Sequence, residues 1–120
     1  GLTGRVESLQ HRTVVVMPIY NESTARTFAA LAAIRESVEA TGLGAHFDYF
    51  IVSDTTNPDV WIAEERAFLA LRRRLGPDAR VYYRHRPKNH HRKAGNIADF
   101  VTRWGGHYEH MVVLDADSLM

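Results

Sequence analysis

The residues best suited to chemistry stand near the end of the chain, where the carboxylates of Asp115 and Asp117 follow the apolar run 111–114. A turn directly after that run can bring both carboxylates toward one hard cation. A divalent ion held by one or two carboxylates usually completes its coordination shell with water and substrate phosphates. An Asp-x-Asp pair also occurs by chance in many proteins, so the pair indicates a divalent metal site without establishing one.

A basic run at residues 84–93 is the second chemical feature. It holds five of the fifteen Lys and Arg residues, both lysines and three histidines, but no acid, and the rest of the chain then has 10 basic and 14 acidic residues. A solvated loop would account for such a run. Alternatively, Arg92 and Lys93 could neutralise a pyrophosphate. Gly95 and Asn96, at the opening of a helix, would then present backbone N–H groups to the same anion.

The composition is that of one small globular domain or a piece of one. The 120 residues are 45% hydrophobic and 24% charged, which is enough for one modest core. Cysteine is absent, which excludes a disulfide framework and a thiolate zinc site. The longest apolar stretch, near 14–19, is far too short to span a bilayer, and the first residues lack the apolar core of a signal peptide. We therefore expect these residues to be soluble.

Four strands and three helices alternate in the predicted structure. The strand-forming runs are 13–17, which Pro18 is expected to end, and then 48–53, 80–83 and 111–114. The first helix is predicted from Ser23 or Thr24 to Ala40, and the second from Pro58, behind an Asn57 N-cap, to Leu75. The third helix follows the basic run and ends at 105–106, and four apolar residues mark its buried face: Ile97, Phe100, Val101 and Trp104.

This order of elements predicts an α/β fold with a mostly parallel four-stranded sheet and helices on both faces. Ligands of such sheets bind beyond the carboxyl ends of the strands, at a switch in strand order. The segments that follow the four strands are all polar: 18–22, 54–56, the basic run and 115–117. Because these segments meet at one edge, we expect a single site that fits a metal-bound nucleoside diphosphate, with Asp54 accepting hydrogen bonds from its base or ribose.

Four stretches, in this order and spacing, resemble the family 2 glycosyltransferases: "VVVMPIYNES", "FIVSDTT", "HRKAGNIADF" and "MVVLDADSLM". The resemblance covers residues 12–120 and leaves 1–11 as an N-terminal tail. It implies the nucleotide-binding half of a nucleotide-diphospho-sugar transferase domain, of the Rossmann-like GT-A type. One departure is visible, since Ser53 stands before Asp54 where the family often has two adjacent aspartates.

The resemblance also implies roles for individual residues. Asp54 matches the aspartate that contacts uracil, and Asp115 and Asp117 match the pair that carries Mg²⁺ or Mn²⁺ on the UDP diphosphate. The other matches line or surround the nucleotide: Pro18, Tyr20, Asn21, Glu22, Arg92, Lys93, Gly95 and Asn96.

The reaction implied by the resemblance is transfer of glucose from UDP-glucose to a growing β-glucan, the backbone of an osmoregulated periplasmic glucan, with inversion. The family's general base lies in a segment beyond Met120, so we expect this chain to be inactive alone. The implied parent is a bacterial inner-membrane protein with this segment on the cytoplasmic side. Expected partners are the glucan acceptor, the remainder of the catalytic domain, the membrane region and an acyl carrier protein. Without its remainder, the chain is expected to expose a sheet edge and to self-associate.

Two other functions stay open from the residues alone. A nucleotidyltransferase or another metal-dependent nucleotide-binding enzyme would use the same strand-end site, and it would prefer a nucleoside triphosphate to UDP. A nucleic-acid-binding module would use 84–93, with Tyr82 and Tyr83 as stacking partners. The acidic balance outside the run argues against the second alternative, because backbone binding needs a wide basic face, and we expect no nucleic-acid partner.

Overall fold

The computed structural model describes residues 12–87 and 92–116, so the predicted tail at 1–11 lies outside the described residues. Its strands are β1 (Thr13–Ile19), β2 (Phe47–Ser53), β3 (Val81–His85) and β4 (His110–Val113). Its α-helices are α2 (Thr24–Ala40), α3 (Pro58–Leu75) and α4 (Arg92–Trp104), and two single 3₁₀ turns are η1 (Gly44–His46) and η2 (Gly105–His107). The predicted alternation of strands and helices is therefore confirmed.

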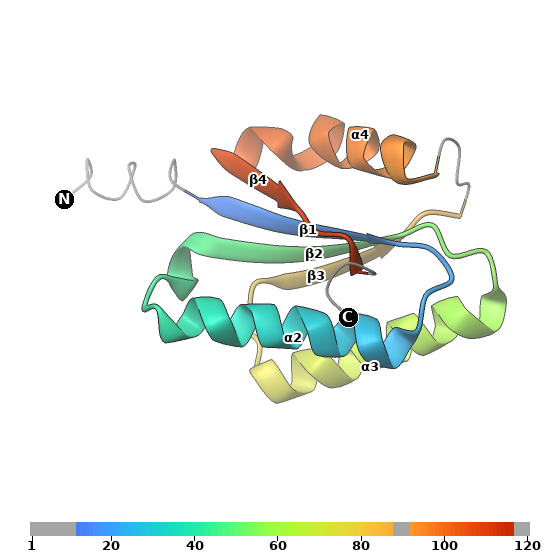
Figure 1. The fold of residues 1–120 in the computed structure, drawn as a ribbon, viewed down its shortest axis with the longest axis horizontal. Helices are drawn as coiled ribbons and strands as arrows, with labels where there is room; N and C mark the ends of the chain where they lie inside the picture. Colours follow the sequence, from blue (N-terminus) through green and yellow to red (C-terminus); the bar gives the residue numbers. More distant parts are fainter. Residues whose placement is uncertain (1–11, 88–91, 117–120) are drawn as a thin grey trace.

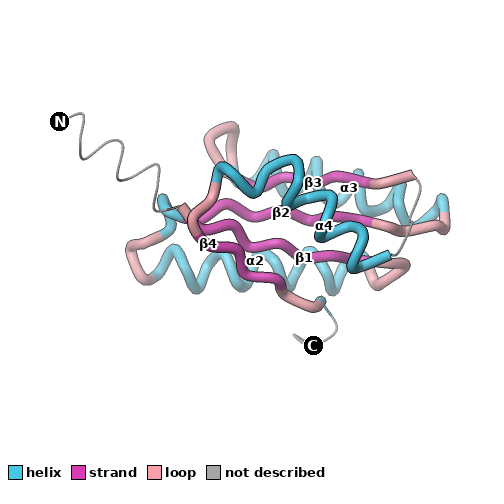
Figure 2. Tube along the Cα trace, turned by 90° about the horizontal axis from the view of Figure 1, so that it is seen from above, coloured by secondary structure: helices cyan, strands magenta, loops and turns pink. Residues whose placement is uncertain are grey.

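All four strands are parallel and lie in the order β3-β2-β1-β4. Helices α2 and α3 cover one face of the sheet, and α4 covers the other (Figure 1; Figure 2). The chain adds β2 and β3 on one side of β1 and then returns to place β4 on the other side. The strand order thus switches between β1 and β4, where ligands of such folds bind.

Two helices begin directly after the N-cap residues that the sequence predicted, Ser23 and Asn57. The Ser23 side chain accepts a hydrogen bond from the backbone N–H of Arg26, and the Asn57 side chain accepts one from that of Asp59. Both caps supply acceptors for N–H groups that a helix cannot satisfy itself. Helix α4 begins at Arg92, so Gly95 and Asn96 lie inside its first turns instead of opening it.

The prediction that Pro18 ends the first strand is wrong, because β1 continues to Ile19. A parallel strand directs successive residues to alternate neighbours, and the Val16 carbonyl accepts from Leu114 of the β4 side at 2.9 Å. Pro18, two residues later, faces the same side, beyond the last residue of β4. Its missing N–H therefore costs the sheet no hydrogen bond.

The core has two layers that follow the strand alternation. Val15, Met17 and Ile51 pack with helices α2 and α3. Val14, Val16 and Val52 point to the other face and pack with α4. Phe50 centres the second layer, with ring centroids 5.0 Å from Phe100 and 5.1 Å from Trp104. The predicted buried face of α4 is thus largely correct, but Val101 is 45% exposed and does not belong to it.

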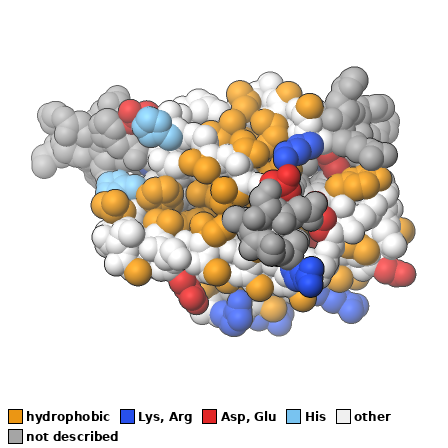
Figure 3. Space-filling view, in the orientation of Figure 1, with side chains coloured by type: hydrophobic (Ala, Val, Ile, Leu, Met, Phe, Trp, Pro, Cys, Tyr) orange, Lys and Arg blue, Asp and Glu red, His pale blue; other side chains and the backbone are white. Residues whose placement is uncertain are grey.

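Strand β4 forms one edge of the sheet and is poorly covered. Its apolar side chains at Met111, Val112 and Val113 are exposed, although neighbouring β1 is buried throughout these positions. Hydrophobic side chains also gather on the face seen in Figure 3. An open apolar edge was expected from the sequence, and self-association through it stays a prediction. Among the described residues, we find no helix with the length and apolar character needed to cross a membrane.

Candidate functional site

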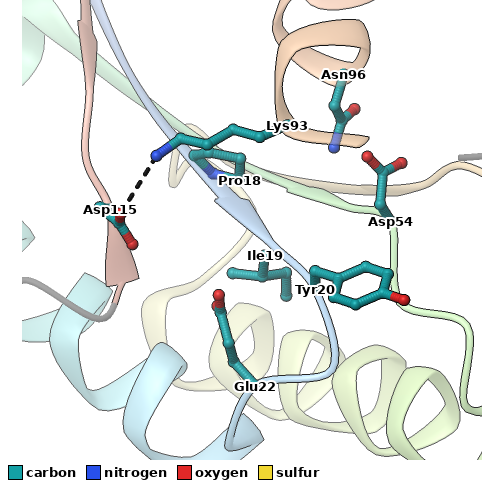
Figure 4. A pocket seen from close by; sticks show the side chains of 8 residues that line it. All are labelled: Pro18, Ile19, Tyr20, Glu22, Asp54, Lys93, Asn96 and Asp115. Carbon is teal, nitrogen blue, oxygen red and sulfur yellow. Dashed lines mark hydrogen bonds and ion pairs between the residues drawn. The ribbon is translucent and has the colours of Figure 1, made fainter. Parts of the chain in front are cut away.

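A cavity of about 230 Å³ opens beyond the carboxyl ends of β1, β2 and β4, at the switch in strand order. Eight described residues line it, and among these only Ile19 was not predicted from the sequence (Figure 4). Six of the others come from the four predicted clusters, and the seventh, Asn96, was predicted beside the basic run: Pro18, Tyr20, Glu22, Asp54, Lys93, Asp115 and Asn96. The fold therefore brings the predicted groups into one pocket.

The remaining four predicted residues are Asn21, Arg92, Gly95 and Asp117. Asn21 and Gly95 belong to the described residues but do not line the cavity. Arg92 is the first residue of α4, and the position of its side chain is not described. Asp117 lies outside the described residues.

Asn21 links the segment after β1 to the segment after β2 through hydrogen bonds. Its side-chain oxygen accepts from the backbone N–H groups of Thr56 and Asn57 at 3.2 and 3.1 Å, and its own N–H donates to the Thr55 hydroxyl at 3.0 Å. Its φ of 49° is in the left-handed region, which asparagine tolerates better than most residues. Asn21 thus shapes the rim of the pocket.

Asp54 is 2% exposed and is held by an arginine that the sequence motifs did not single out. Arg86 donates from Nε to one carboxylate oxygen at 2.8 Å and from Nη2 to the other at 3.1 Å. Such a bidentate ion pair fixes the plane of the carboxylate. The predicted contact of Asp54 with a nucleotide base would therefore be made by an Asp54–Arg86 unit. Both residues follow predicted strands, but only the pairing of β2 with β3 places them side by side.

The buried carboxylate of Glu64, in α3, is hydrogen-bonded to both residues that flank Asp54. Glu64 is fully buried and accepts hydrogen bonds from the hydroxyls of Ser53 and Thr55, each at 2.6 Å, and from that of Tyr83 at 2.8 Å. Burial, and then the hydrogen bond to Glu64, raise the pKa of Tyr83, so this hydroxyl stays a donor. Residues on both sides of Asp54 are thereby fixed to one helix.

Asn96 attaches α4 to the sheet at the same edge. Its side-chain N–H donates to the Val52 carbonyl at 2.9 Å, and its side-chain oxygen accepts from Arg84 at 3.1 Å. The residue is buried and its amide is already engaged on both sides. Asn96 therefore positions the first turn of α4 above the pocket, and a direct contact with nucleotide stays a prediction.

Lys93 and Asp115 face each other across the mouth of the pocket, with Nζ 3.2 Å from Oδ2 (Figure 4). Their side chains are 56% and 44% exposed, so an incoming ligand can reach both. The ammonium group suits a diphosphate, and the carboxylate suits the cation that accompanies a diphosphate.

The oxygen donors of the pocket fit a hard divalent cation better than a zinc ion, because Glu22, Asp54 and Asp115 supply carboxylates and cysteine is absent. Within 12–87 and 92–116, no three His, Asp or Glu side chains converge closely enough to hold a metal by themselves. A metal carried by Asp115 together with Asp117 stays a prediction.

Curated relatives of the chain bear a consistent name. Over 118 residues it is 55% identical to the glucans biosynthesis glucosyltransferase H of Bradyrhizobium diazoefficiens, covering 98% of this chain and 16% of that protein. Over 116 residues it is 54% identical to the protein of the same name from Shewanella baltica, covering 97% of this chain and 16% of that protein. The chain is homologous to one segment of these glucosyltransferases.

This finding confirms the resemblance that the four motifs indicated. The chain spans 16% of the length of either relative, so most of each lies outside the matched segment. No family model matches the chain, and no solved structure matches it.

Where the structure describes the basic run, most of its side chains contact other residues of this chain. Arg84 contacts Asp99 at 3.1 Å, Arg86 contacts Asp54, and the ring of Tyr82 lies 5.1 Å from that of Phe50. These groups stabilise the fold and the pocket, and the absence of a nucleic-acid partner stays a prediction.

Replacing Arg86 with Lys is expected to lower the free energy of unfolding by about 1–2 kcal/mol, because an ammonium group cannot make the two-pronged contact with buried Asp54. Chemical denaturation monitored by circular dichroism would measure the change. Arg66→Lys, an exposed change on α3, is the matched control and should stay within about 0.5 kcal/mol of the parent chain. Equal stability of the Arg86→Lys chain would show that the pair contributes little.

Proposed function

We propose that this chain is the UDP-binding part of an inverting glucosyltransferase, which transfers glucose from UDP-glucose to a growing β-glucan. The observation that carries the proposal is the pocket at the switch in strand order, which is lined by seven of the predicted residues, among them Asp54, Lys93 and Asp115. The name that the relatives share, glucans biosynthesis glucosyltransferase H, supports the reaction class and the glucan product.

Each part of the pocket has a role in this proposal. Asp54, held by Arg86, and Tyr20 receive the base and ribose, while Lys93 and the backbone of the first turn of α4 receive the diphosphate. A Mg²⁺ or Mn²⁺ ion, when bound at Asp115 and Asp117, would neutralise charge on the diphosphate. Lys93 would stabilise the charge that grows on UDP as an acceptor hydroxyl attacks the anomeric carbon and the bond to UDP breaks.

The general base that takes the proton from the acceptor hydroxyl is assigned to a segment beyond residue 120. The chain by itself should therefore bind UDP without turning over UDP-glucose. The proposed setting is the inner face of a bacterial inner membrane, where the remainder of the protein supplies the acceptor side. An acyl carrier protein remains a proposed further partner.

Calorimetric titration of UDP into the chain with Mn²⁺ present tests the nucleotide and metal roles together. Binding should be saturable, and the Asp115→Ala/Asp117→Ala variant should bind at least about tenfold more weakly. The variant Asp59→Ala/Asp78→Ala removes the same charge from exposed positions and should bind like the parent chain. Undiminished binding by the first variant would contradict the metal site, and a clear preference for UTP would favour a nucleotidyltransferase.

A further inference from the structure

A second cavity, of about 320 Å³, lies between α2 and α3. Its wall includes Val81, the first residue of β3, so it lies toward the amino ends of the strands. The candidate nucleotide pocket lies beyond their carboxyl ends, and the two share no lining residue. This second cavity is therefore available for a ligand of its own.

The floor of the cavity is aliphatic. Leu31 of α2, Leu71 of α3 and Val81 are buried members of the core, and Leu75 packs against them. A cavity of this size falls at the lower end of the range for small-molecule sites, roughly 300–1,000 Å³. An apolar floor favours a ligand with a hydrocarbon part, since burying a polar group there would leave it without hydrogen bonds.

Three charged residues line the cavity: Arg35, Arg74 and Glu36. Arg74 is exposed and makes no ion pair with any described residue. Arg35 approaches Glu39 only at 3.6 Å. Cations near the end of α3 are favoured by the helix dipole in any case, but Arg74 differs from its neighbour Arg73 in lining the cavity.

The wall of the cavity is held in place by Arg72. Its guanidinium donates to the carbonyls of Ala79 at 2.8 Å and of Val81 at 2.9 Å, which ties the last turn of α3 to the start of β3. The space is therefore bounded by fixed elements, and a ligand would enter a site that is already formed.

The buried hydroxyl of Tyr49 has no hydrogen-bond partner among residues 12–87 and 92–116. Tyr49 belongs to the same core cluster as Leu31, Leu71 and Val81. Burial raises the pKa of this hydroxyl, and the charge of Arg35 acts on it in the opposite direction. The hydroxyl therefore lies within electrostatic reach of an arginine that lines the cavity.

We propose that this cavity binds an amphiphilic anion, a compound with an aliphatic body on the leucine and valine floor and a carboxylate or phosphate head at Arg35 and Arg74. The proposal does not depend on the glucosyltransferase function, because no residue of the nucleotide pocket takes part. A free fatty acid and an anionic lipid in a membrane share this chemistry.

Titration of decanoate below its micelle concentration into the 120-residue chain tests the proposal. Acetate, which has the carboxylate without the long chain, and decanol, which has the long chain without the carboxylate, are the control compounds. Decanoate should bind saturably at one site per chain and at least about tenfold more tightly than either. Arg74→Gln should weaken this binding about tenfold, whereas Arg73→Gln on the same turn should not. Ala32→Phe, which fills the cavity, should abolish binding, whereas Ala33→Phe on the exposed side of α2 should not.

Vesicles of phosphatidylglycerol distinguish the two sources of ligand. If they compete with decanoate, and if Ala32→Phe weakens vesicle binding, the site takes a lipid from a surface; if they do not compete, the ligand is a free amphiphile. The proposal is overturned if decanoate binding does not saturate, if Arg73→Gln and Arg74→Gln weaken it equally, or if Ala32→Phe binds like the parent chain.

Discussion

Replacing Glu64 with Ala should lower the free energy of unfolding by about 3–5 kcal/mol, because three hydroxyl donors lose one buried acceptor. Ser53 and Thr55 are themselves buried, so water cannot easily replace the carboxylate. Thermal and denaturant unfolding of the purified variant would measure the loss.

Two further substitutions separate the hydrogen bonds from a general effect of changing α3. Glu64→Gln keeps the shape and one acceptor oxygen, so it should lose only about 1–2 kcal/mol. Glu65→Ala changes the adjacent exposed residue and should stay within about 0.5 kcal/mol. If Glu64→Ala were as stable as Glu65→Ala, the network would not hold the segment that carries Asp54.

Replacing Asp48 with Asn should lower the free energy of unfolding by a similar amount, about 3–5 kcal/mol. Asp48 is buried at the amino end of β2, where its carboxylate contacts Arg12 and Arg80 and accepts from the Tyr108 hydroxyl at 2.6 Å. These partners precede β1, β3 and β4, so one carboxylate joins the starts of all four strands. Asp78→Asn, in the exposed turn before β3, is the control and should change stability by less than about 0.5 kcal/mol.

The same carboxylate predicts acid sensitivity. Burial acts to raise the pKa of Asp48, but hydrogen bonds from Arg80, Tyr108 and Arg12 outweigh burial and hold it below its usual value. The folded state therefore gains stability above the unfolded pKa of about 3.9 and loses it as pH falls through the lower folded pKa. Unfolding measured between about pH 5 and about pH 2 should show a steeper loss for the parent chain than for Asp48→Asn. Parallel curves would contradict this assignment.

Local patterns in the sequence were sufficient for the order of the elements and for most of the residues that line the pocket. Asn57 followed by Pro58 marks the start of α3, and the spacing of Ile97, Phe100 and Trp104 marks the buried face of α4. These features depend on residues a few positions apart, which helix geometry alone brings together. The pocket was predictable for a related reason, because parallel strands place the segments that follow them at one edge.

Only the tertiary structure decided which hydrogen-bond and ion-pair partners the pocket residues have. Asp54 is paired with Arg86 because β2 lies beside β3. The side-chain amide of Asn96 is hydrogen-bonded to Val52 and Arg84 because α4 packs over β2. Val101 is exposed because α4 packs over β1 and β2 and leaves β4 open. The sequence by itself determined the elements, their caps and the edge at which the polar groups meet. Which partner each side chain takes depends on contacts between residues far apart in the chain, and those exist only once the strands have taken their order.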